Sequence, residues 1–147
     1  MIDRRHIINV TIRRLGAFLS FDLFVASIVA AICYGESAAD VLRSWGRILT
    51  SPSPLVTDYF RLGSLSAALL NAAMCGGSCA LMLALLRGGK YRPSVWAGYF
   101  LVIAHCFYGL NFVNMWPPLL GFAICCKIHS LRFRDNLDRA MLSPASP

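Results

Sequence analysis

The sequence predicts an all-α integral membrane protein with three or four membrane segments and one amphipathic interfacial helix. Of its 147 residues, 57% are hydrophobic and only 14% are charged, against roughly 25% charged in a typical soluble domain. The charged residues cluster between long neutral stretches. This pattern excludes a soluble enzyme domain and a disordered chain. It also assigns the net charge of +7 to basic residues that flank apolar spans, and not to a nucleic-acid-binding surface.

Two segments have the length of a membrane crossing, which takes about 20 apolar residues. Leu15–Tyr34 carries one charge, Asp22, and no A-x-A cleavage site ends it, so we interpret it as a retained signal-anchor helix. Leu62–Leu86 carries no charge and is the clearest span. Between them, Ser37–Leu49 places apolar side chains on one helical face, which predicts an amphipathic helix in the membrane interface. The prolines of Thr50–Pro54 end that helix.

The last pair of apolar segments, Ser94–Leu110 and Pro117–Cys126, is shorter and allows two interpretations. They are either two ordinary crossings or two halves of a broken, re-entrant helix that enters and leaves on the cytoplasmic side. We favour the broken helix, because a Pro117-Pro118 start preceded by asparagines is typical of one. Residues 1–130 are then a single membrane domain. Residues 131–147 are expected to be a cytoplasmic segment with a surface helix and a disordered tail.

Five polar residues within these segments are the candidate substrate-binding residues. Asp22 is either a proton or cation site or a structural carboxyl bonded to a neighbouring helix, since a carboxylate in hydrocarbon costs roughly 2.5–3.5 kcal/mol. Asn71 either bonds across a helix interface or faces a cavity. His105 is either a satisfied core residue or a proton relay with Asp22. Asn111 and Asn114 either replace part of a solute's hydration or form a turn.

Small residues repeat every four positions along the second span, at Ala68, Ala72, Gly76 and Ala80. Such a row lets helices approach closely. It is a candidate for the contact between two copies, or equally for packing within one subunit. The six cysteines lie in or beside apolar segments and are interpreted as small buried hydrophobes. No CxxC or HxxxH spacing is present, so we expect no metal and no cofactor.

Three stretches resemble a known family: Ser51–Phe60, Leu70-Asn71-Ala72 and Gly109–Gly121. They are similar to one repeat of an uncharacterised bacterial membrane family, domain of unknown function fifteen seventy-six, over about Thr50 to Lys127. Members of that family carry two such repeats in a longer chain, and no activity is established for them. The resemblance therefore implies architecture and a bacterial inner-membrane location. It also implies that two copies of this chain, as a homodimer in the lipid bilayer, would reproduce the family's arrangement.

No Walker motif, dinucleotide fingerprint, HExxH or Ser/His/Asp arrangement is present, so we expect no enzyme. The leading hypothesis is a half-size transporter or channel subunit for a small solute, acting as an oligomer. The alternative is a non-transporting structural or accessory protein that binds another membrane protein. A water-lined cavity at Asp22, Asn71 or Asn111–Asn114 would favour transport. Polar groups that are all paired within the chain would favour the accessory role.

Charge predicts the orientation. Eleven Lys and Arg residues lie before the first span, in the turn after the second span and after the last segment, while three lie in the loop between the first two spans. Both termini are therefore expected in the cytoplasm. Thiol labelling of single-cysteine variants should reach positions Arg4, Lys90 and Arg134 from inside the cell and position Thr50 from outside. Comparable labelling of one position from both sides would contradict a fixed topology.

Overall fold

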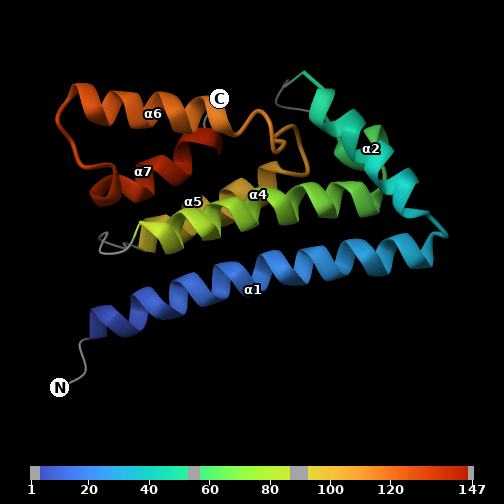
Figure 1. Ribbon diagram of the computed structural model, residues 1–147, viewed down its shortest axis with the longest axis horizontal. Helices are drawn as coiled ribbons and strands as arrows, with labels where there is room; N and C mark the ends of the chain where they lie inside the picture. Colours follow the sequence, from blue (N-terminus) through green and yellow to red (C-terminus); the bar gives the residue numbers. More distant parts are fainter. Residues whose placement is uncertain (1–3, 53–56, 87–92, 146–147) are drawn as a thin grey trace.

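The computed structural model describes residues 4–52, 57–86 and 93–145, and within these residues it is all helical (Figure 1). The elements, in chain order, are α1 (Arg4–Cys33), α2 (Ala38–Thr50), α3 (Tyr59–Leu62), α4 (Leu65–Leu85), α5 (Pro93–His105), α6 (Trp116–Ile128), the 3-10 turn η1 (Phe133–Asn136), α7 (Leu137–Leu142) and the 3-10 turn η2 (Ser143–Ala145).

The two long helices, α1 and α4, lie side by side and form the base of the fold (Figure 1). By length and composition, Arg14–Cys33 of α1 and all of α4 are apolar enough to cross a membrane. In α4, 56% of the apolar window is buried, against 22% in α1. Helix α4 is therefore the central element, while α1 leaves most of its circumference uncovered.

The small-residue row of α4 packs inside this one chain. Ala68, Ala72 and Ala80 are buried. A Cβ atom added at Gly76 would lie 2.5 Å from Ile103 Cδ1 of α5 and 3.0 Å from Ser20 Oγ of α1. Of the two roles considered for this row, packing within one subunit is the one observed, so the row is not free to contact a second copy.

Helix α2 is the amphipathic helix expected over Ser37–Leu49. Ser37 caps it, because its Oγ accepts the Asp40 N–H at 3.2 Å while the Asp40 carboxylate accepts the Ser37 N–H at 3.3 Å. The hydrogen bonds from the Ser37 side chain and backbone lower the pKa of the exposed Asp40 carboxyl. Val41 and Ile48 are buried on the inner face of α2, which packs over α3 and α4.

The second apolar span begins with a break instead of one continuous helix. Asp58 caps the short α3, with its Oδ1 accepting the Phe60 N–H at 2.9 Å. The chain leaves helical geometry at Gly63, and Ser64 caps α4 by accepting the Ala67 N–H at 3.3 Å. The expected span Leu62–Leu86 is therefore α4 alone, with α3 as a separate turn before it.

The C-terminal segment packs between the two short apolar helices. Helices α5 and α6 both contact α7 and η2, and α7 buries Leu137, Ala140 and Met141 completely. This differs from the surface helix expected over Leu131–Met141. Of the expected tail, Ser143–Ala145 forms η2, and residues 146–147 lie outside the described residues.

Gly98 is the point where α5 and α7 come closest. A Cβ at Gly98 would lie 2.7 Å from Met141 Cβ, whereas a Cβ at Gly121 of α6 would meet nothing within 4 Å. We expect Gly98→Ala to lower the free energy of unfolding by about 1–2 kcal/mol, because overpacking costs about 1–3 kcal/mol and outweighs the gain in helix propensity. The matched variant Gly121→Ala should be neutral or stabilising. Apparent melting temperatures in detergent test this pair, and equal values for both variants would contradict the close contact.

Candidate functional site

Helix α5 ends at His105 because the chain turns sharply there. The N–H groups of Tyr108 and Leu110 both donate to the His105 carbonyl oxygen, each at 2.9 Å. Gly109 has a φ of 119°, a conformation that favours glycine. The non-helical residues 106–115, which we call the hairpin loop, then lead into α6, whose first turn contains Pro117. Both interpretations of the sequence require such a loop, and α5 ends five residues before the end of the expected segment Ser94–Leu110.

Asn71 of α4 holds this hairpin loop through its side-chain amide. Its Nδ2 donates to the carbonyl oxygens of Cys106 at 3.0 Å and Leu110 at 2.9 Å. Its Oδ1 accepts the Phe112 N–H at 3.2 Å. Asn71 is completely buried, so both amide protons and the amide oxygen serve backbone groups of the hairpin loop and not water.

Asn111 and Asn114 lie in the hairpin loop and fix its conformation. The Asn111 Oδ1 accepts the N–H groups of Val113 and Asn114, both at 2.9 Å. The Asn114 side chain accepts the Asn111 N–H at 2.6 Å and donates to the Gly109 carbonyl at 2.8 Å. The Asn111 Nδ2 also donates to the Ile48 carbonyl of α2 at 3.0 Å, so the loop is joined to the helix above it.

Asn71, Asn111 and Asn114 form a group that we call the asparagine cluster, and Tyr59 also bonds to its loop. No sequence pattern connects Tyr59 with the loop. Its hydroxyl donates to the Gly109 carbonyl at 2.6 Å and lies 3.4 Å from the Asn111 Nδ2, and its backbone N–H donates to Phe107 O at 3.2 Å. The side chain is completely buried. Burial raises the pKa of this hydroxyl, which keeps it protonated as a donor. In the sequence, Tyr59 is recognisable only as the residue after the Asp58 cap, because its hydrogen-bond partners lie about fifty residues later in the chain.

The structure brings Asn71, Asn111 and Asn114 together but leaves His105 and Asp22 apart from them. The His105 Nδ1 lies 2.8 Å from the Leu101 carbonyl oxygen of its own helix, to which the Nδ1-protonated tautomer donates. Among the described residues, Asp22 has neither a hydrogen bond nor an ion pair, and its side chain is exposed on α1. The relay between His105 and Asp22 that the sequence allowed is therefore not assembled.

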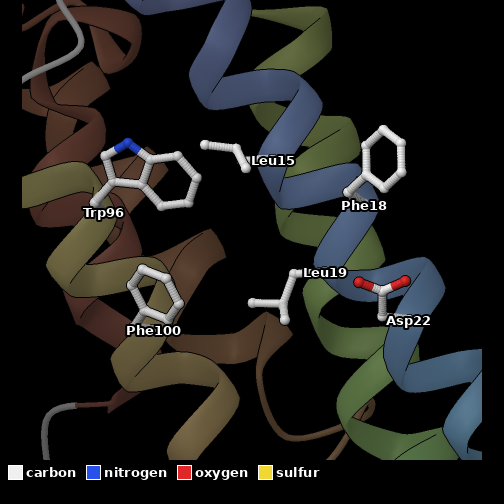
Figure 2. Close-up of a pocket in the computed structure, with 6 residues that line it drawn as sticks. All are labelled: Leu15, Phe18, Leu19, Asp22, Trp96 and Phe100. Carbon is white, nitrogen blue, oxygen red and sulfur yellow. The ribbon is translucent and has the colours of Figure 1, made fainter.

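Asp22 lines an open groove of about 320 Å³ between α1 and α5. Figure 2 shows Leu15 and Leu19 of α1 facing the Trp96 and Phe100 rings of α5, with Phe18 and Asp22 farther out on α1. A second groove, of about 450 Å³, is lined by Ser78 and apolar residues near the C-terminal end of α4, together with Trp116 and Phe133. None of the three asparagines lines either groove.

Four of the six cysteines are buried, and three of these, Cys75, Cys79 and Cys106, lie in the core formed by α4 and α5. Cys33 and Cys125 are exposed, so the interpretation as buried hydrophobes is wrong for these two. No group of three His, Cys, Asp or Glu side chains is placed to hold a metal ion within residues 4–52, 57–86 and 93–145.

The family model "Protein of unknown function (DUF1576)" matches residues 37–146. The chain belongs to this family. The match begins at the cap of α2 and runs past η2, which is wider than the resemblance over Thr50 to Lys127, while α1 lies before it. Neither a curated protein nor a solved structure matches the chain. The DUF1576 region thus contains the whole asparagine cluster, and Asp22 lies on the helix that precedes that region.

Replacing Asn71 tests the hairpin loop. Asn71→Leu keeps a similar volume but leaves two buried carbonyl oxygens and one partly buried N–H without partners, and each buried group costs about 1–3 kcal/mol. We expect a strongly lowered melting temperature and faster amide hydrogen exchange over residues 106–115. The control is Asn136→Leu, because the half-buried Asn136 donates to Arg132 O in a solvent-exposed hydrogen bond of its own turn. Unchanged exchange in Asn71→Leu would contradict the proposed role of Asn71.

Proposed function

We propose that this chain is a helical membrane protein that acts as a non-transporting structural or accessory subunit. In this proposal α1 and α4 cross the bilayer and both termini lie in the cytoplasm. The protein encloses no solute path of its own and associates with another membrane protein. The observation that carries the proposal is that the amides of Asn71, Asn111 and Asn114 are all used by the chain's own backbone.

The lengths of α5 and α6 support a re-entrant hairpin. Each helix has 13 residues, or about 20 Å, which is shorter than the ~30 Å hydrocarbon core. They end and begin at the hairpin loop, which Asn71 holds about 9 Å from the N-terminal end of α4. Both helices would enter from the cytoplasmic side, in agreement with the charge distribution. Non-helical backbone at that depth requires burial in protein or contact with water.

The hydrogen bonds around the hairpin loop supply that burial. The loop backbone meets Asn71 on α4, Tyr59 on α3 and the Ile48 carbonyl at the end of α2. In transporters, unwound segments leave such groups available to coordinate a solute or an ion. In this chain the polar groups of the hairpin loop are bonded to Asn71, Tyr59 and the Ile48 carbonyl, and the loop packs against the end of α2. The geometry therefore favours a structural role for the three asparagines over solute binding.

A half-size transporter or channel subunit is the second candidate, and Asp22 is the observation that favours it. This carboxyl lies in the middle of the span Arg14–Cys33, is exposed and lines the groove between α1 and α5. An ionisable residue within a membrane span is a candidate for a proton or ion site. Any path through Asp22 would have to form between this chain and a neighbour, since it lies on the outer surface of α1.

Flux through reconstituted protein tests the two candidates. We expect vesicles containing the full chain to show the same proton, K⁺ and small-solute permeability as empty vesicles, because the buried amides are occupied. Pyranine fluorescence and light scattering measure this, with gramicidin as the positive control for ion flux. Flux that appears with the wild-type chain and disappears with Asp22→Asn would overturn the proposal and establish the transporter. Thiol labelling on the same vesicles verifies that the chain is inserted.

A further inference from the structure

We infer that the outward face of α1 is the contact surface for a second copy of this chain, with the two Asp22 side chains meeting across a two-fold axis. The inference rests on the membrane placement in the proposed function and adds the identity of the occupant and the residue that fixes its position. It does not depend on whether the chain transports a solute.

The first observation is an uncovered heptad seam along α1. Exposed residues recur there at alternating spacings of three and four, the pattern with which parallel helices pack knobs into holes. The seam consists of Leu15, Phe18, Asp22, Val25, Val29 and Ile32. The opposite face of α1, which includes Gly16, Ser20, Ser27 and Ala30, is buried. Helix α1 therefore has two packing faces, and only one of them is filled within the chain.

The second observation is the carboxyl in the middle of this seam. The buried hydroxyls of α1 are paired within the chain, since Ser20 lies 2.8 Å from the Tyr99 hydroxyl and Ser27 donates to the Ser66 carbonyl at 2.7 Å. Asp22 has no such partner among the described residues. A carboxylate facing lipid is costly, and a polar partner on a neighbouring chain would lower that cost.

A second copy supplies that partner in the right place. Both copies insert with the same orientation, so a two-fold axis along the membrane normal makes the two α1 helices parallel and brings equal residue numbers to the same depth. The two Asp22 side chains then meet at the axis, where each is the polar group nearest to the other. A single polar residue in an apolar seam also fixes register and orientation, as a buried asparagine does in a parallel coiled coil.

The groove beside the seam gives the second helix a place to pack. Trp96 and Phe100 of α5 form its far wall, and Leu15 and Leu19 form its near wall (Figure 2). Phe18 projects from the seam with 66% of its surface exposed. Its counterpart on the second copy can reach this groove, so each copy would offer both the knob and the hole.

Energy transfer between labelled copies in lipid vesicles tests the contact. Dye is attached at the exposed Cys125 in a Cys33→Ser background, because the remaining four cysteines are buried. We expect transfer that rises with the protein-to-lipid ratio. Asp22→Leu should lower the association constant roughly 3- to 30-fold, the range for one interhelical polar contact in a membrane. Asp22→Asn should associate within about threefold of wild type, since an amide both donates and accepts.

Matched pairs on α1 locate the interface. Phe18 and Phe21 are 66% and 62% exposed, but only Phe18 lies in the seam, so Phe18→Ala should weaken association and Phe21→Ala should not. In a background with Cys33 and Cys125 replaced by Ser, Val29→Cys should form a disulfide between copies, and Ile28→Cys at the same depth should not.

Three results would overturn the inference: a wild-type chain that remains monomeric at high protein-to-lipid ratio, Asp22→Leu that associates as wild type, or cross-linking at Ile28→Cys but not at Val29→Cys. A chain that is monomeric and shows no flux would contradict the contact between copies but agree with the proposed non-transporting function. A dimer that conducts ions would agree with the contact between copies but contradict the proposed function.

Discussion

The side-chain amide of Asn71 is the interaction on which the C-terminal half of the molecule depends. Helix α5 stops at His105, so the carbonyls of Cys106 and Leu110 and the N–H of Phe112 have no helical partner. One amide offers two donors and one acceptor, and all three are matched here. A carboxylate would lack the donors, and an apolar side chain would lack all three groups. These three hydrogen bonds stabilise the turn from α5 into α6. This turn positions α7, which packs against both helices.

The close approach of α1, α4 and α5 is a separate constraint, and it depends on the absence of a side chain at Gly76 of α4. At Gly76 there is no side chain, so Ile103, Tyr99 and Ser20 all reach within about 3 Å of where a Cβ would stand. The Tyr99 hydroxyl then donates to the Gly16 carbonyl at 2.8 Å, which links α5 to α1 across α4. Small residues along a helix are usually taken as an interface between chains in membranes. Here they hold three helices of one chain together.

The features predicted correctly from the sequence are those written in local patterns. Helix α2 follows from apolar periodicity and the prolines after it, and the start of α6 at Trp116 follows from Pro117. The three asparagines could be singled out because amides are rare in apolar segments. The distant partners of Asn71 and Asn111 could not, since they lie 35 to 63 residues away in the chain. The packing of Leu137 and Met141 was missed because the surrounding segment is polar and contains too few apolar residues to indicate a buried helix.

The serines and the aspartate of α1 lie on opposite faces of the helix, and only the serines are hydrogen-bonded within the described part of the chain. Ser20 and Ser27 lie on the inner face and are satisfied by α5 and α4, which adds specificity to the bundle at little cost. Asp22 is two residues from Ser20, so when the inner face is filled the carboxyl must point outward. The same rotation of α1 that satisfies its hydroxyls therefore exposes its carboxyl. In a bilayer this carboxyl faces lipid, and that exposure is the observation from which the proposed contact with a second copy starts.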